Sequence, residues 1–253
     1  MGGFVDVDRV GGVCILRLNR PEKLNAISTD VERALSTELE QAARDCRALV
    51  LAGEGRAFSA GADITEFSDR DPDAIMSYYR GTGAVYELFA TLPIPTLVAI
   101  HGYCLGAALE LALAADFRIA DETSVFGLPE VALGILPSSG GTHRLVRLLG
   151  TARAKELALL RDRVDAHEAH RLGLVTEVTP AGQALERAIE LAQKLASLPP
   201  LAASVTKEAI DAMGEASRDA ALLLERIGYA ALAQTEEARA ALDGLAERRR
   251  DDT

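Results

Sequence analysis

Two glutamates stand where a carboxylate is costly to bury, and they are the residues best placed to do chemistry. Glu110 lies between two leucines in an alanine-rich stretch with high helix propensity. An apolar setting raises the pKa of a carboxyl group, which suits a general acid or base near neutral pH. Glu130 follows Pro129, whose fixed φ angle stiffens the chain just before it. The two carboxylates therefore make a candidate acid–base pair.

A strand, a break and a helix are expected to position Glu110. Residues 96–100 form a short apolar run rich in β-branched residues, which predicts a strand. The pattern becomes helical from Leu105 onwards, and we expect the helix to begin near Gly106 and Ala107. Its free N–H groups and the positive end of its dipole would then lie beside the site.

A second set of short elements is expected around Glu130. Residues 117–120 are typical of another strand, and residues 125–128 are expected to form a turn that leads into Glu130. Residues 134–141 form a glycine-rich bend that opens a helix over residues 142–149. An anion site between two carboxylates at a helix N-terminus is a plausible catalytic arrangement.

These segments resemble the enoyl-CoA hydratase/isomerase (crotonase) family. The resemblance rests on HGYCLGAALE, which ends in Glu110, on GLPE, which ends in Glu130, and on GILPSSGGTHRL, which follows. It implies an α/β fold, a crotonase-like spiral of ββα turns followed by a helical C-terminal oligomerisation region. We expect the spiral core over residues 1–195 and the helical region over residues 196–253, with assembly into a homotrimer or a dimer of trimers.

The resemblance also implies an oxyanion hole made of backbone N–H groups. The small residues of FSAGADI, residues 58–64, would let the backbone approach a ligand closely. By resemblance the two donors are the N–H groups of Ala62 and Ala107. The family usually has glycine at the second position, but alanine keeps the N–H group.

The family resemblance further assigns the proton transfers and the substrate contacts. Glu110 is expected to activate water and Glu130 to donate the proton. Ser138 stands where the family commonly has a glycine whose N–H group holds the water, and serine adds a hydroxyl group there. The residues expected to bind the substrate or its CoA part are Lys23, Leu24, Ala60, Asp63, Ile64, Gly106 and Ser138.

The implied reaction is the addition of water to a 2-enoyl-CoA thioester. No metal and no cofactor is expected, since CoA is part of the acyl-CoA substrate. Three alternatives stay open: an enoyl-CoA isomerase, another acyl-CoA-processing member of the family, and a non-catalytic acyl-CoA-binding scaffold. The presence of both glutamates favours the hydratase, because other branches of the family often keep only the second glutamate.

Composition narrows the class of protein. Hydrophobic residues make up 49% and charged residues 26% of the 253 residues, which is typical of a globular protein with a large core. The net charge of −11 disfavours binding to nucleic acid, whose phosphates are held by basic patches. Three scattered cysteines and the lack of a leader or a long apolar run predict a cytoplasmic protein that does not enter a membrane.

Three other candidate sites are weaker. Ser59 lies in a sequence that approximates a nucleophile elbow, but no histidine is evidently placed as its base. His167 and His170 could share a metal ion on a helix, yet an exposed helix face explains them better. His101 is expected to be a hydrogen-bonded structural residue.

The remaining segments are mostly assigned by periodicity. A hairpin is expected at the N-terminus, then a helix capped by Ser28. Helical spacing dominates after residue 149 and ends in one long alanine-rich run over residues 217–249. Four residues of the segment before residue 87 are candidates either for shaping the acyl pocket or for a helix packing face: Ile75, Met76, Tyr79 and Tyr86.

Overall fold

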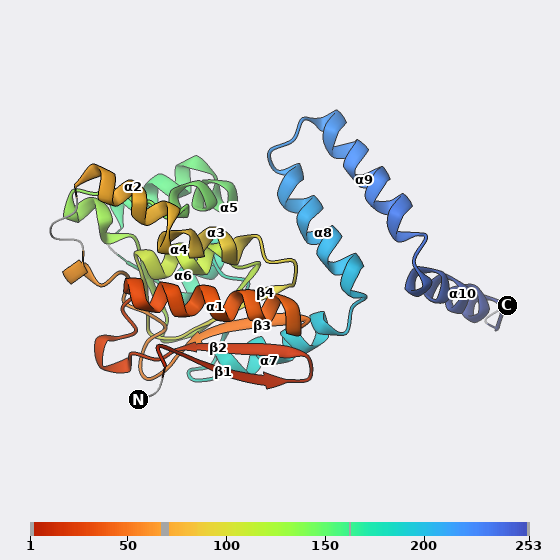
Figure 1. The fold of residues 1–253 in the computed structure, drawn as a ribbon, viewed down its shortest axis with the longest axis horizontal. Helices are drawn as coiled ribbons and strands as arrows, with labels where there is room; N and C mark the ends of the chain where they lie inside the picture. The colour runs from red at the N-terminus through yellow and green to blue at the C-terminus, as the bar shows by residue number, and fades with distance from the viewer. Residues whose placement is uncertain (1–2, 67–70, 162, 252–253) are drawn as a thin grey trace. The chain divides into compact units, whose positions relative to one another are not determined.

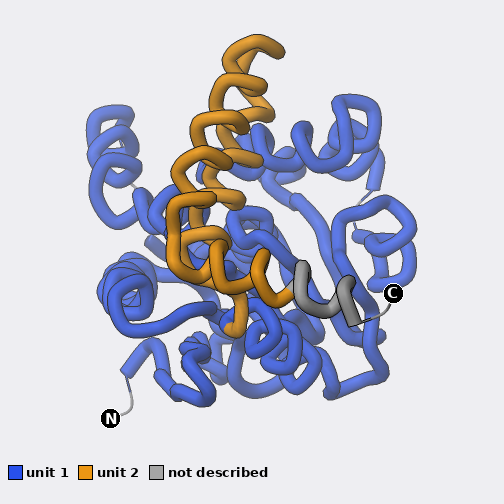
Figure 2. The backbone as a smooth tube through the Cα atoms, turned by 90° about the vertical axis from the view of Figure 1, so that its right-hand side faces the viewer, with its two compact units in different colours: residues 1–196 blue, residues 197–253 orange. Residues whose placement is uncertain are grey.

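The computed structural model describes residues 3–66, 71–161 and 163–251, with side chains up to residue 244. The chain divides into two compact units between Ala196 and Ser197 (Figure 2). This division lies next to the one expected at residues 195 and 196.

The first unit is built on a six-stranded sheet (Figure 1). Its strands, in spatial order, are β1 (Val5–Val10), β2 (Val13–Leu18), β3 (Ala48–Gly53), β4 (Thr96–Ile100), β6 (Phe117–Asp121) and β9 (Glu177–Thr179). The hairpin β1–β2 is antiparallel, and each later pairing is parallel. Every residue of β4 is buried, as expected for a parallel strand that is covered on both faces.

A small second sheet includes the two strands that precede the two glutamates in the sequence. It contains β5 (Tyr103–Leu105), β7 (Val125–Gly127) and β8 (Val164–Asp165). The expectation of a turn over residues 125–128 is therefore wrong, because β7 pairs with β5 in parallel and with β8 in antiparallel orientation. Strands of three residues are too short for a periodic pattern, and only tertiary pairing defines them.

Helices cover both faces of the main sheet. Helix α1 (Thr29–Asp45) is capped by Ser28, whose hydroxyl accepts a hydrogen bond from the N–H of Val31 at 3.3 Å. It buries Val31, Leu35, Leu39 and Ala42 at helical spacing, on the face that holds the larger apolar cluster. Helix α7 (Ala184–Ala196) covers the other face with a row of alanines that packs closely on β2, β3 and β4.

The other elements of the first unit connect the strands. The helices are α2 (Pro72–Arg80), α3 (Val85–Ala90), α4 (Ala107–Ala114), α5 (Gly141–Lys155), the π-helical η5 (Glu156–Leu160) and α6 (Ala166–Leu172). The 3₁₀ turns are η1 (Pro21–Lys23), η2 (Ile64–Glu66), η3 (Thr82–Ala84) and η4 (Pro129–Leu133). Strand pairs followed by helices recur along the chain, which is the spiral that the resemblance predicted.

The second unit consists of α8 (Pro200–Met213), α9 (Arg218–Leu232) and α10 (Glu236–Asp251). The alanine-rich run expected to be helical over residues 217–249 is divided into two helices, because the chain leaves the helix between Leu232 and Glu236. Helices α8 and α9 pack against each other but bury no residue fully. Large apolar side chains stay exposed on them, among them Leu201, Ile210, Leu223, Ile227 and Tyr229. In the described parts of the chain, no helix has the length and apolar character needed to cross a membrane.

Candidate active site

The loop around Ala62 is fixed by a backbone pairing that leaves one N–H group pointing away. Ile27 donates its N–H to the carbonyl of Gly61 at 2.8 Å, and Asp63 donates its N–H to the carbonyl of Ile27 at 2.8 Å. The N–H of Ala62 therefore points to the opposite side, and no described residue accepts a hydrogen bond from it. This N–H is available to a ligand.

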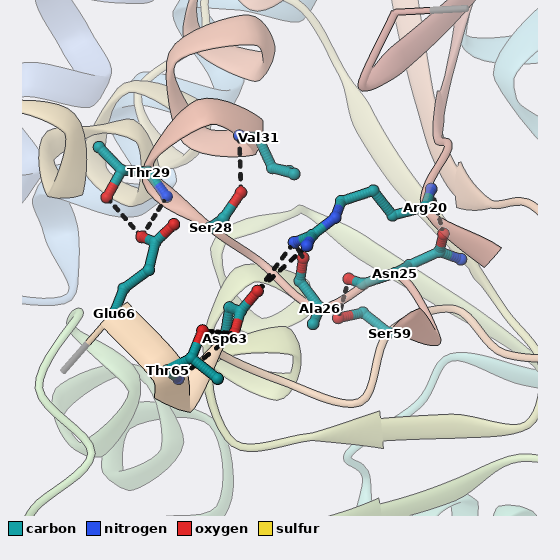
Figure 3. Close-up of polar contacts among 10 residues, drawn as sticks. All are labelled: Arg20, Asn25, Ala26, Ser28, Thr29, Val31, Ser59, Asp63, Thr65 and Glu66. Carbon is teal, nitrogen blue, oxygen red and sulfur yellow. Dashed lines mark hydrogen bonds and ion pairs between the residues drawn. The ribbon is translucent and has the colours of Figure 1, made fainter. Parts of the chain in front are cut away.

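Side-chain contacts hold the Ala62 loop in place (Figure 3). Both terminal nitrogens of Arg20 contact Asp63 Oδ2 at 3.1 Å, and the Thr65 hydroxyl donates to Asp63 Oδ1 at 2.7 Å. The hydrogen bond from Thr65, together with the Arg20 guanidinium, lowers the pKa of Asp63. The carboxylate is thus held by the protein itself, and it links η2 to the loop at Arg20.

Asn25 also holds this loop in place through hydrogen bonds, a role that was not predicted from the sequence. Its side-chain oxygen accepts from the N–H of Arg20 at 2.9 Å, and its amide donates to the carbonyls of Glu54 and Ala57 at 2.8 Å. The Ser59 hydroxyl donates to the backbone carbonyl of Asn25 at 2.8 Å. Asn25 has a φ of +54°, a conformation that asparagine tolerates better than most residues. An asparagine in the loop that follows a strand was the available signal.

The start of α4 lies directly beside this loop. Gly106 precedes the helix with a φ of +54°, and the first N–H groups of α4 have no acceptor inside the helix. A side chain on Gly61 would place its Cβ 2.7 Å from the Leu105 carbonyl oxygen and 3.8 Å from the Ala107 nitrogen. The segments of Ala62 and Ala107 are therefore in close contact, as the predicted oxyanion hole requires.

Glu110 is buried and held by a backbone cradle. Glu110 is only 3% exposed. Its Oε1 accepts hydrogen bonds from the N–H groups of Ser139 at 2.8 Å and Gly141 at 3.0 Å. Desolvation raises the pKa of Glu110 to about 7, although the two N–H groups oppose this shift. The charge of Glu130 adds to the increase. Glu110 therefore titrates in the range that acid–base catalysis needs.

Glu130 lies over the N-terminus of α4 with one oxygen unsatisfied. The residue is 8% exposed, and burial raises the pKa of its carboxyl group. A Cβ on Gly106 would lie 2.8 Å from Glu130 Oε1, so that oxygen closely approaches the turn that opens the helix. Oε2 is buried without a hydrogen-bond partner among the described residues. A buried, unsatisfied carboxyl oxygen costs stability, which marks it as a functional candidate.

The other residues predicted to bind the substrate differ in their exposure and in their hydrogen bonds. Ser138 is exposed, and its hydroxyl is hydrogen-bonded to the Tyr79 hydroxyl of α2. Lys23 is exposed, and Ile64 is 71% exposed, so both side chains are free to meet a ligand. Leu24 is half-buried, and its carbonyl accepts from the N–H of Ala60 at 2.9 Å. Lys23, Leu24 and Ile64 lie on the loops around Ala62, whereas the Asp63 carboxylate is occupied by Arg20 and Thr65.

Of the four residues named in the segment before residue 87, the structure assigns Tyr86 alone to a packing face. Tyr86 is 2% exposed and belongs to the apolar core, so the packing-face interpretation holds for it. Helix α2 buries no residue, and Ile75 and Met76 are 40% and 51% exposed. They and Tyr79 remain candidates for contact with an acyl chain.

The weaker sequence candidates have structural explanations. Ser59 is fully buried and bonded to the backbone of Asn25 and Gly61, which argues against a nucleophile. His101 Nε2 lies 3.0 Å from the Gly55 carbonyl oxygen, which confirms the structural role. His167 and His170 lie on the exposed side of α6. The residues that the structure describes include no group of three or more side chains placed to hold a metal ion.

Comparisons with known proteins decide the family. A model of the family described as enoyl-CoA hydratase/isomerase matches residues 8–252. The chain belongs to the enoyl-CoA hydratase/isomerase family. It is 38% identical to a 2,3-dehydroadipyl-CoA hydratase of Escherichia coli over 97% of this chain and 96% of the relative. It is 40% identical to an enoyl-CoA isomerase/hydratase of Mycosarcoma maydis over 94% of this chain and 91% of the relative.

A solved structure agrees with this assignment. An enoyl-CoA hydratase from Bacillus anthracis superposes with a TM-score of 0.91 at 36% identity, and the match covers 97% of this chain and 96% of that structure. The predicted crotonase-like α/β fold is therefore confirmed.

Proposed function

We propose that this member of the family is an enoyl-CoA hydratase, which adds water to a 2-enoyl-CoA thioester and forms a 3-hydroxyacyl-CoA. One observation carries the proposal: two buried carboxyl groups with raised pKa values, Glu110 and Glu130, flank the start of a helix whose N–H groups are unpaired within it. A binding scaffold would need neither buried carboxyl group.

The oxyanion hole supplies electrostatic stabilisation. As water adds to the β-carbon, negative charge develops on the thioester oxygen of an enolate-like transition state. The N–H groups of Ala62 and Ala107 would donate to this oxygen, each contributing about 3 kcal/mol. The polar contacts at Asp63 and Asn25 would serve this step by holding Ala62 in place.

The two carboxyl groups divide the proton transfers. Glu110, with a pKa of about 7, is substantially ionised at neutral pH and would accept a proton from the attacking water. Burial favours the protonated form of Glu130, which would donate its proton to the α-carbon. One proton is gained and one is lost by the enzyme, so the addition of water is balanced.

The remaining contacts complete the proposal. The N–H of Ser138 would help to hold the water, and the backbone at Gly106 would line the thioester site. The CoA part would lie along a surface formed by Lys23, Leu24, Ala60, Asp63 and Ile64. The scheme uses no cofactor. The exposed apolar side chains of α8 and α9 support association with further copies of the chain, and by family resemblance we propose a homotrimer or a dimer of trimers. We propose that the enzyme works in the cytoplasm.

An isomerase activity is the second candidate, because one relative is named an isomerase/hydratase. Moving a double bond needs proton transfer at two carbons but no water. The same oxyanion hole would serve it, and Glu130 alone could shuttle the proton.

The test follows the ultraviolet absorbance of a short 2-enoyl-CoA with the wild type, Glu110→Gln and Glu130→Gln. We expect the wild type to remove the conjugated absorbance and each variant to be slower by at least about 100-fold. Glu122→Gln, which changes an exposed glutamate, is the matched control and should keep full activity. Loss of absorbance at equal rates in all four proteins would refute the assigned roles. Activity only with 3-enoyl-CoA would support the isomerase instead.

A further inference from the structure

The guanidinium group of Arg144 lies directly over the turn that cradles Glu110. Its Nη1 donates to the Ser139 carbonyl at 3.0 Å, and its Nη2 lies 2.6 Å from Glu87 Oε2 on α3. A Cβ on Gly140 would lie 2.2 Å from Nη1, so the planar group covers that glycine at close range. The Arg144 side chain is 15% exposed, whereas Glu87 is 72% exposed.

Arg144 also contacts the turn through its backbone. Its backbone N–H donates to the Gly140 carbonyl at 3.0 Å, while its guanidinium donates to the carbonyl of the preceding residue, Ser139. Arg144 therefore binds two carbonyls of the turn, those of Ser139 and Gly140. Gly140 has a φ of +86°, a left-handed conformation that glycine adopts readily.

The opposite side of the same turn faces the carboxylate. The N–H groups of Ser139 and Gly141 both reach Glu110 Oε1, so the Ser139 residue is held by Arg144 at its carbonyl and by Glu110 at its nitrogen. A displacement of this turn would remove two hydrogen bonds from Glu110 together. Hydrogen bonds to an ionised carboxylate are strong, and they weaken steeply when the distance or the angle departs from the ideal. A small displacement of the turn is therefore enough to weaken both bonds.

We propose that Arg144 is a positioning residue for Glu110: its guanidinium clamps the 139–141 turn and keeps the two N–H groups aimed at Glu110 Oε1. The inference rests on the proposed function where Glu110 acts as the base. The contact of Arg144 with the turn affects the ionisation of Glu110, and this ionisation can be measured without catalytic turnover.

The charges around Glu110 set the direction of the effect. Glu130 on η4 raises the pKa of Glu110, and Arg144 on α5 lowers it. Tyr86 on α3 is buried, and burial keeps its phenol neutral at ordinary pH. Removing the guanidinium removes a positive charge and loosens two hydrogen bonds, and both changes disfavour the carboxylate form. The pKa of Glu110 must therefore rise.

The experiment compares the wild type, Arg144→Gln, Arg144→Lys and the control Glu87→Gln. The first measurement is an infrared difference titration of the protonated carboxyl groups, with Glu110→Gln used to assign the band of Glu110. The second is the pH profile of kcat/KM with a short 2-enoyl-CoA. Thermal melts check that each variant is folded, and the lysine variant serves if the glutamine variant is not.

We expect Arg144→Gln to move the Glu110 titration upward by about one pH unit. The acid limb of kcat/KM should move with it, so that activity lost near pH 7 is recovered at higher pH. Arg144→Lys should show a smaller shift, because an ammonium group keeps the charge but cannot form the planar double contact. Glu87→Gln keeps the bond to Ser139 and should titrate as the wild type does or slightly lower.

Two results would overturn the proposal: an unchanged Glu110 titration in folded Arg144 variants, or a loss of activity by the same factor at every pH. Failure of the proposed function looks different. In that case the wild type would show no hydration, while the infrared shift would still report on the clamp.

Discussion

The two sides of the candidate site treat buried carboxylates in opposite ways. On the Ala62 side, Asp63 meets Arg20 and Thr65, and its pKa is lowered. On the other side, Glu110 and Glu130 are buried with raised pKa values, and Glu130 Oε2 has no hydrogen-bond partner among the described residues. The first arrangement stabilises the fold, whereas the second costs stability.

This difference separates scaffold from chemistry. A carboxylate whose oxygens are hydrogen-bonded or ion-paired stays ionised and can hold a loop in place. Because its pKa is lowered, it does not exchange a proton at neutral pH. A desolvated carboxyl group is ready to exchange one, and the fold tolerates its cost where function needs it. Variants that change one side of the site at a time test this comparison.

The largest effect is expected from Gly141→Ala. A Cβ there would lie 2.4 Å from Glu110 Cγ and 2.6 Å from Glu110 Oε1, so the carboxylate must leave its cradle. We expect a loss of kcat by about 100-fold or more with a smaller change in KM, because the base is misplaced. Steady-state kinetics with a 2-enoyl-CoA measures this split.

Ser139→Ala is the control for that variant. It removes a hydroxyl group but keeps the N–H that donates to Glu110. Its kcat should stay within about threefold of the wild type, since it changes no hydrogen bond of the carboxylate. A Gly141→Ala enzyme as active as this control would show that the cradle does not position the base.

An effect of intermediate size is expected on stability, with opposite signs on the two sides. Asp63→Asn leaves Arg20 without its carboxylate in a pair that is 16% and 10% exposed, and should cost about 1–3 kcal/mol. Glu130→Gln replaces a poorly satisfied carboxyl group by a neutral isostere, and should leave stability unchanged or raise it. Denaturant unfolding of both variants measures the difference.

The pH dependence sharpens the same test. The pKa of Asp63 is lowered from 3.8, so its stabilisation is present above that pH and is lost as the pH falls. The pKa of Glu130 is raised from 4.5 in the folded protein, so the folded protein keeps this proton to a higher pH than the unfolded chain does. The contribution of Glu130 to the free energy of unfolding therefore declines as the pH rises above 4.5. Each variant should remove the corresponding slope from the curve of stability against pH. Parallel curves for both variants would contradict the comparison.

The sequence predicts the elements whose cause is local. Ser28 caps α1 as expected, and the strand at residues 96–100 has the predicted bounds. Both follow from a capping side chain or an apolar run that needs no distant partner. The sequence predicts a turn where β7 lies, because the three residues of this strand are ordered only by pairing with β5 and β8. The break at residues 233–235 had a local signal that the prediction missed, because the hydroxyl of Thr235 accepts a hydrogen bond from the N–H of Ala238 at 3.2 Å at the start of α10.

The site divides in the same way. The apolar surroundings of Glu110 and the family spacing of Glu110 and Glu130 singled out both residues, and the structure buries both. Their catalytic roles stay predictions. The roles of Asn25 and Arg144 could not be predicted, because each depends on a contact that only the fold creates. The Asn25 amide reaches the Ala57 carbonyl 32 residues away, and the Arg144 guanidinium lies between the nearby Ser139 carbonyl and the distant Glu87 carboxylate. Such contacts are created by the fold and leave no spacing to recognise.

The smallest effect is expected from Ser138→Gly, and it tests which part of the turn matters. The change removes the hydroxyl that contacts Tyr79 but keeps the Ser138 N–H, which is the group assigned to the water. We expect kcat/KM for a short 2-enoyl-CoA to change by less than about fivefold, in line with the loss of one exposed hydrogen bond. Tyr79→Phe removes the same contact from the other partner, so the two variants should agree within error. A large loss in Ser138→Gly with a normal Tyr79→Phe would mean that the serine hydroxyl itself binds the water, and the chemistry would then extend beyond the two carboxyl groups.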